Sequence, residues 1–128
     1  MIINKDNSHV LNTKEVYIHD DELIEMKWNR EQQTVCLMMT KHENLHHSKD
    51  YYINFENVLG FSSTSCDYWG ASEAVNTIYL EENEQTLIPF LMKKGECQID
   101  FDNYFETVIQ FISGDELRIV CKKIDICI

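Results

Sequence analysis

Short runs of alternating apolar and polar residues recur along the chain, which is the pattern of β-strands with one buried face. The first clear run is Leu23–Trp28, where Ile24, Met26 and Trp28 fall on one face. A turn separates it from 34–40, where apolar residues also alternate. The two runs predict a hairpin whose shared apolar face, Trp28 included, lies against the core.

Similar runs predict most of the remaining strands. Residues 74–80 and 85–92 form a second expected hairpin, and Pro89 confines the latter strand to an edge or a bulge because proline has no N–H to donate. A Ser-Gly-Asp turn at 113–115 predicts a third hairpin, whose first arm, 105–111, fits either a strand or a helix. Further short strands are expected at 15–18, 51–55, 58–62, 97–101 and 117–128.

Two stretches lack this pattern. Residues 1–12 begin with three apolar residues and continue with turn formers, so they predict a weakly ordered lead-in or a short edge strand. Residues 41–50 are polar, contain three of the five histidines and show no apolar period, so they predict a loop.

The many short strands, and the lack of long runs with a 3.6-residue period, favour an all-β fold. At 128 residues the chain is long enough for one core and short for two. We therefore predict a single domain over residues 1–128. It should be an antiparallel β-sandwich or partly open barrel with room for one short helix.

The acidic balance of the chain narrows its partners. There are 11 basic and 22 acidic residues, which gives a formal net charge of −11 at pH 7. Such a surface repels phosphate backbones and anionic headgroups, so we expect neither nucleic-acid nor membrane binding. A basic protein is a compatible partner, although the same charge also keeps a protein in solution without any partner.

The N-terminus has no apolar segment followed by small residues, and no apolar run approaches membrane-spanning length, so we expect a cytoplasmic protein of bacterial type. Five scattered cysteines without a CxxC pair predict neither a disulfide framework nor a zinc site. Cys36 and Cys121 lie in apolar runs and are expected to be small buried hydrophobes.

The segment 62–70, SSTSCDYWG, has the most unusual composition. Ser65 and Asp67 flank Cys66, and Trp69 is able to wall a pocket, which allows a small hydrolase or ligand-binding domain. However, a reactive thiol needs a base or a cation nearby, and the neighbouring aspartate acts to raise the thiol pKa. A packed loop cysteine is therefore favoured over a nucleophile.

Two other groups invite a chemical interpretation. On a helix, the histidines and acids of 42–50 would share a face that binds zinc, but Leu45 is the only aliphatic residue that would seat such a helix. The acidic pairs 20–21 and 81–82 lack the spacing and glycine of a calcium loop, and they do not identify a pair of catalytic acids. We predict solvated turns at both pairs, and no metal or cofactor.

Several stretches together resemble a known group of sequences. The sequence contains His19-Asp20, NFENVLGF at 54–61, TSCDYWG at 64–70 and SGDEL at 113–117. In these features it resembles small uncharacterised bacterial β-domain proteins. The order of His-Asp, strand, turn, strand and Phe-x-x-Val is also similar to immunity proteins of polymorphic toxin systems. The resemblance implies an all-β bacterial domain that binds a protein toxin, and it implies no catalytic residues.

We therefore predict a non-catalytic protein-binding domain, with acidic side chains that speed association and aromatic anchors that hold the complex. The expected contact residues are Asp67, Tyr68, Trp69, Asp20, Asp21, Glu22, Glu81, Glu82 and Glu84. Two alternatives stay open. One is the hydrolase or ligand-binding domain with its pocket around Cys66, Asp67 and Trp69. The other is a structural protein that acts only through self-association at an uncovered edge strand.

Overall fold

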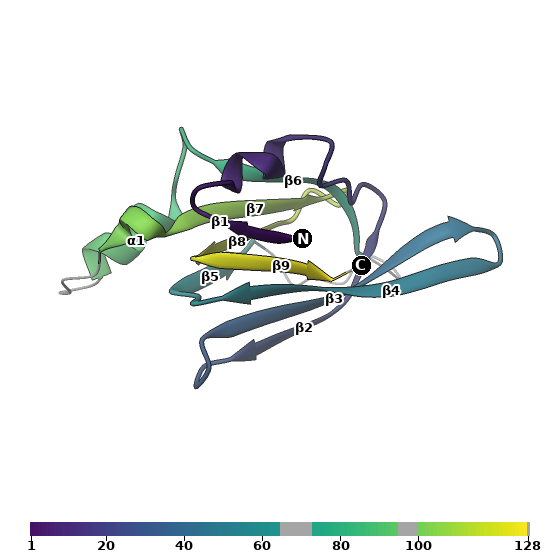
Figure 1. Cartoon of the computed structure of the whole chain (residues 1–128), viewed down its shortest axis with the longest axis horizontal. Coiled ribbons are helices and arrows are strands. Elements are labelled where there is room, and N and C mark those ends of the chain that lie inside the picture. Colours follow the sequence, from purple (N-terminus) through teal and green to yellow (C-terminus); the bar gives the residue numbers. More distant parts are fainter. Residues whose placement is uncertain (65–72, 95–99, 128) are drawn as a thin grey trace.

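The computed structural model describes residues 1–64, 73–94 and 100–127 (Figure 1). Within these ranges, nine strands form one antiparallel sheet in the order β1-β9-β4-β3-β2-β6-β7-β8-β5. The strands are β1 (Ile2–Asn4), β2 (Glu22–Asn29), β3 (Thr34–Asn44), β4 (His47–Glu56), β5 (Gly60–Ser63), β6 (Glu73–Glu81), β7 (Phe105–Phe111), β8 (Glu116–Cys121) and β9 (Lys123–Cys127). The helices are η1 (Ser8–Asn12), α1 (Leu87–Lys94) and η2 (Phe101–Asn103), where η marks a 3-10 helix. The all-β prediction is confirmed, and the sheet is not closed into a barrel.

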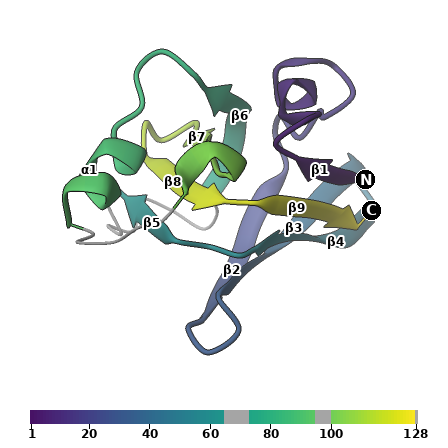
Figure 2. The same cartoon turned by 60° about the vertical axis from the view of Figure 1, so that its left-hand side comes forward.

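The chain passes from one half of the sheet to the other at two places, between β4 and β5 and between β8 and β9, and the sheet bends there. β4 pairs with β9 in one half of the sheet, and β5 pairs with β8 in the other. Only Lys122 separates β8 from β9, and its N–H donates to the carbonyl of Glu56 at 3.2 Å. The two halves therefore turn toward each other, as the rotated view shows (Figure 2).

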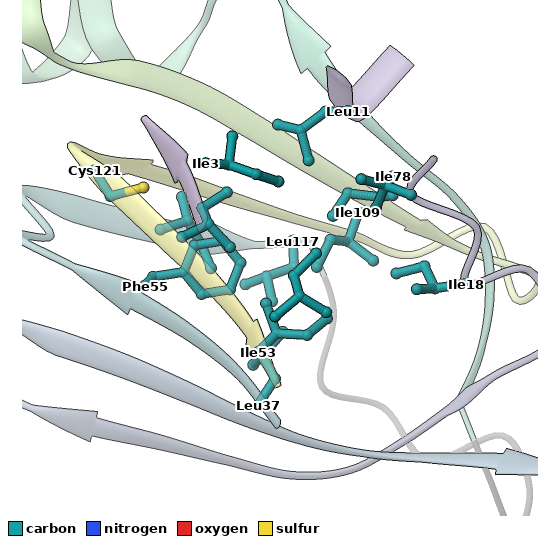
Figure 3. Close-up of a cluster of buried hydrophobic side chains, with 14 of the residues drawn as sticks. Ile3, Leu11, Ile18, Leu37, Ile53, Phe55, Ile78, Ile109, Leu117 and Cys121 are labelled. Carbon is teal, nitrogen blue, oxygen red and sulfur yellow. The ribbon is translucent and has the colours of Figure 1, made fainter. Parts of the chain in front are cut away.

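The core fills the concave side of this bent sheet (Figure 3). Alternate strand residues project inward from both halves, so that Leu37 and Ile53 face Ile109 and Leu117 across the core. All four side chains are 3% exposed or less. The period of two that the sequence shows is thus the burial pattern of one face of the sheet.

The N-terminal stretch is part of this core. The weakly ordered lead-in was the wrong alternative, because Ile3 in β1 pairs with Ile124 and Leu11 in η1 is 1% exposed. The strand expected at 15–18 is also absent from the described structure. Val16 and Ile18 are nevertheless buried, so their apolar pattern reflects packing without strand pairing.

The hairpin of β2 and β3 forms as predicted, but a bulge changes which residues face inward. The register shifts between Leu23 and Glu25, so Leu23 and Met26 both pack against the core while Ile24 is 50% exposed. Trp28 is 40% exposed, so its prediction as a core residue was wrong. Its ring lies edge-on against Phe61 of β5, with centroids 5.3 Å apart, at the margin of the core.

Residues 41–50 form a hairpin, and the predicted loop was wrong. β3 continues to Asn44, and β4 begins at His47. β2 leaves β3 at the pair Glu22 and Thr40, so beyond this point the hairpin has two strands and its residues 42–50 are exposed. No apolar period marks these strands, because neither of their faces meets the core.

The strand expected at 85–92 was also wrong, because α1 occupies most of this stretch. Pro89 lies in the first turn of the helix, where the backbone N–H groups have no intrahelical partner, so proline removes no hydrogen bond there. Leu87, Ile88 and Leu91 pack against Val120 on the outer face of β8. The expected hairpin around 81–84 therefore does not form.

The C-terminal hairpin is confirmed. The stretch 105–111, which the sequence left open, is strand β7, and Gly114 in the following turn has φ +96. The strand expected at 97–101 falls mostly outside the described residues, and Phe101 begins η2 instead.

Candidate functional site

Of the segment 62–70, which has the most unusual composition, the structure describes only residues 62–64. Cys66, Asp67, Tyr68 and Trp69 lie outside the described residues. The pocket expected at the cysteine and the aromatic contact therefore stay predictions. Thr64, the last described residue before them, exchanges two hydrogen bonds of 3.0 Å with the backbone of residue 116 at the start of β8.

Beside this point, three carboxylates converge on one guanidinium on the outer face of β6, β7 and β8. Arg118 donates to Glu106 at 2.6 Å, to Glu81 at 3.4 Å and to Glu116. We call these four side chains the carboxylate cluster. Glu81 and Glu106 are direct neighbours in the ladder, where two like charges repel. Arg118 is the cation that makes this arrangement tolerable.

The cluster is half enclosed and keeps an excess of negative charge. The side chain of Glu106 is 0% exposed and that of Arg118 is 12% exposed. Burial acts to lower the pKa of Arg118, but its hydrogen bonds to Glu116 and Glu106 raise that pKa overall, so the guanidinium is always charged. One cation offsets one of three carboxylates, which leaves a formal charge of −2 on the outer face of the sheet.

Glu106 also organises helix α1. Its two carboxylate oxygens accept from the backbone N–H groups of Ile88 at 2.8 Å and Thr86 at 3.2 Å. An anion at this end of a helix satisfies unpaired donors and is favoured by the helix dipole. Glu106 thus connects helix α1 to the sheet, so the negative charge of this side chain is part of the folded structure.

The acids predicted at 81–84 divide between this cluster and the solvent. Glu81 was expected on a solvated turn, which was wrong, because it ends strand β6 with its side chain 13% exposed. Glu82 and Glu84 are exposed as expected. Burial raises the pKa of Tyr79, and the negative charges of Glu81, Glu116 and Glu84 raise it further against the opposing effect of Arg118.

The acids predicted at 20–22 have three different environments. Asp20 has φ 69 and a side chain that is 70% exposed, 3.1 Å from His19. Asp21 is buried, so its expected place on a solvated turn was wrong. It accepts from the hydroxyl of Tyr51 at 2.5 Å and lies 4.0 Å from the ammonium of Lys41.

Two of these acids, Asp21 and Glu22, hold the base of the β3–β4 hairpin. Burial and the hydrogen bond to Asp21 raise the pKa of Tyr51, so this hydroxyl stays a donor. On the other face, Glu22 lies 3.2 Å from His42. Their role in the described structure is therefore to anchor the hairpin.

The histidines and cysteines show no clustered chemistry in the described ranges. No group of three or more His, Cys, Asp or Glu side chains there is placed to hold a metal ion. Cys121 is buried as predicted, and burial raises the pKa of its thiol to about 12. Cys36 is only half-buried, and burial raises its pKa as well. Thiols with raised pKa values are weak nucleophiles.

Sequence reasoning missed Glu106, Glu116 and Arg118. Each sits in a strand-like run at a position that alternation assigns to the outer face, and such positions are ordinarily solvated. The signal that would have found the cluster is the register of β6, β7 and β8, which no local pattern contains.

The fold and the site define a class: a small all-β domain with an acidic, partly enclosed cluster on the outer face of its sheet. A scan against protein-family models, a search of curated proteins and a search of solved structures returned no match. The resemblance to immunity proteins therefore stays a prediction. None of the described helices is both long and apolar enough to cross a membrane.

Proposed function

We propose that this protein is a non-catalytic binding domain whose partner is a basic protein. The resemblance to immunity proteins suggests a specific form of partner, the basic domain of a toxin. The observation that carries the proposal is the excess negative charge of the carboxylate cluster, which the fold fixes in place beside exposed acids.

The binding surface in this proposal is smaller than the sequence indicated. Glu82, Glu84 and the outer edge of the cluster attract the partner, and Tyr79 lies among them as a flat surface for a cationic side chain. Tyr68 and Trp69 are the proposed aromatic anchors. Glu81 contributes charge from inside the cluster, while Asp21 and Glu22 belong to the base of the β3–β4 hairpin and Asp20 is exposed beside His19.

A capture experiment with charge variants tests this function. Wild type is compared with a Glu82→Lys, Glu84→Lys variant, both of whose sites are exposed, in a lysate of the organism that encodes the protein. The matched control is Asp6→Lys, Glu31→Lys, which changes two exposed acids outside the cluster. Both variants have a formal charge of −7, so they differ only in where the charge is lost.

We expect a basic protein to be retained by wild type and by the control and to be lost with the Glu82→Lys, Glu84→Lys variant. Its association should slow as salt is added, because exposed charges steer encounter. A Tyr68→Ala, Trp69→Ala variant should release the partner faster. Retention of no basic protein by folded wild type, or equal retention by the two charge variants, would refute the proposal.

A further inference from the structure

The hairpin formed by residues 41–50, which we call the arm, extends past the rest of the sheet (Figure 1). β9 leaves β4 at Tyr52, just as β2 leaves β3 at Thr40, so neither outer edge of the arm pairs with another described strand. An isolated two-stranded hairpin has marginal stability in water, and this one buries no apolar side chain. Leu45 at its tip is 98% exposed.

Three polar contacts hold the arm at its base. The hydroxyl of Thr40 donates to Asp50 at 2.7 Å, His42 lies 3.2 Å from Glu22, and Lys41 lies 4.0 Å from Asp21. These contacts fix the direction of the arm without enclosing it. The chain therefore presents an ordered, extended ribbon with an apolar tip to solvent.

A hollow of about 380 Å³, lined by both polar and apolar side chains, lies at the base of the same arm. Its walls include Glu15, Val16, Tyr17, Ile18, Lys41 and Ile126. Tyr17 at its rim is 65% exposed, so the hollow is reached from solvent. The hollow has room for a leucine side chain.

The distance from the hollow to the tip is the length of the arm. Leu45 lies four positions after Lys41, which lines the hollow, and four positions span about 14 Å along a β-strand. When two arms lie antiparallel about a two-fold axis, the tip of each reaches the base of the other. This is the geometry of a closed, isologous contact, in which the same two surfaces meet twice.

The distribution of charge also favours contact between the arms of two copies of the chain. The arm holds two lysines and two acids, so with neutral histidines its formal charge is zero and the whole −11 lies on the rest of the chain. From Leu45 to Lys49 there is no acid, while Glu15 lies in the wall of the hollow. The arm is thus a place where one copy can approach another without repulsion between like charges.

We propose that the chain forms a two-fold dimer by exchanging arms, with Leu45 of each copy seated in the hollow of the other. This contact lies apart from the carboxylate cluster, so it does not depend on the proposed partner. It assigns the hollow a specific occupant, a second copy of this chain.

Sedimentation of the purified chain over a range of concentrations tests the dimer. Leu45→Asp should raise the dimer dissociation constant about 100-fold or more, because two leucines leave their seats at once. Ile112→Asp is the matched control, since it changes an exposed aliphatic residue in the turn of another hairpin, and it should leave the dimer unchanged. Both sites are exposed, so both variants should stay folded.

A mixing experiment separates arm exchange from other dimers. Tyr17→Glu alters the hollow and Leu45→Asp alters the tip, so each variant alone loses both contacts and should be monomeric. Mixed together, one copy supplies an intact tip and the other an intact hollow, so one contact returns and a weaker heterodimer forms. A monomeric wild type, a Leu45→Asp variant that dimerises normally, or a mixture that stays monomeric would each overturn the proposal.

Discussion

The carboxylate cluster makes a sharp prediction about stability. In an Arg118→Met variant, the methionine fills much of the volume of the arginine stem but removes the cation. Glu106, whose side chain is 0% exposed, then loses its cation and retains the backbone N–H groups of Ile88 and Thr86 as partners. Breaking a buried ion pair from one side costs about 3–5 kcal/mol, because an uncompensated charge is left behind.

The same geometry predicts that a second substitution will rescue the first. Glu106→Gln in the Arg118→Met background removes the buried charge and keeps a carbonyl oxygen that can accept from Ile88. The double variant should therefore recover about 1–3 kcal/mol relative to Arg118→Met alone.

Equilibrium unfolding in urea measures both effects. For Arg118→Met, we expect an unchanged dependence of the unfolding free energy on urea. In thermal unfolding, its melting temperature should fall by roughly 10–20 °C. Lys122→Met, which removes a cation outside the cluster, should cost little by comparison. A loss below about 1 kcal/mol for Arg118→Met, or a double variant less stable than that single variant, would contradict the assigned role of the cluster.

Three further predictions concern the rest of the fold. The folded state holds the Tyr51 proton more tightly than the unfolded chain does, so the stability from this group is present below pH 10 and should fall by about 1.4 kcal/mol per pH unit above it. Alkaline unfolding should show that slope in wild type and a shallower one in Tyr51→Phe, and equal slopes would contradict it. Thr107→Val should stabilise by about 1–2 kcal/mol in urea unfolding, because the hydroxyl of Thr107 is buried without a hydrogen-bond partner among the described residues; a loss would show that the hydroxyl is bonded. Gly114→Ala should cost about 1 kcal/mol in melting experiments, since φ +96 strains a residue with a Cβ, and no change would mean that the turn adapts.

Local pattern was sufficient where one face of a strand meets the core. The alternation in 34–40 and 51–55 matches the buried faces of β3 and β4, and the Ser-Gly-Asp turn joins β7 to β8 as expected. In these stretches burial and backbone period depend on the same residues, so the sequence predicts the structure directly.

Local pattern failed where distant partners decide the backbone. The arm continues the pairing of β3 and β4 without any apolar signal of its own. Helix α1 begins where Glu106, far away in the sequence, accepts from its first N–H groups. The bulge in β2 moves Ile24 outward, which the spacing of apolar residues does not reveal.

By itself, the sequence determined the all-β class, most strand positions and the acidic balance, because these follow from residue type and from contacts near in the chain. Only the tertiary structure decided which acids lie inside and which face solvent. Glu81, Glu106 and Glu116 meet Arg118 through the pairing of three strands, and Asp21 meets Tyr51 across the base of the arm. The net charge follows from the composition, but which charged side chains are buried and which partners they have depend on strand register.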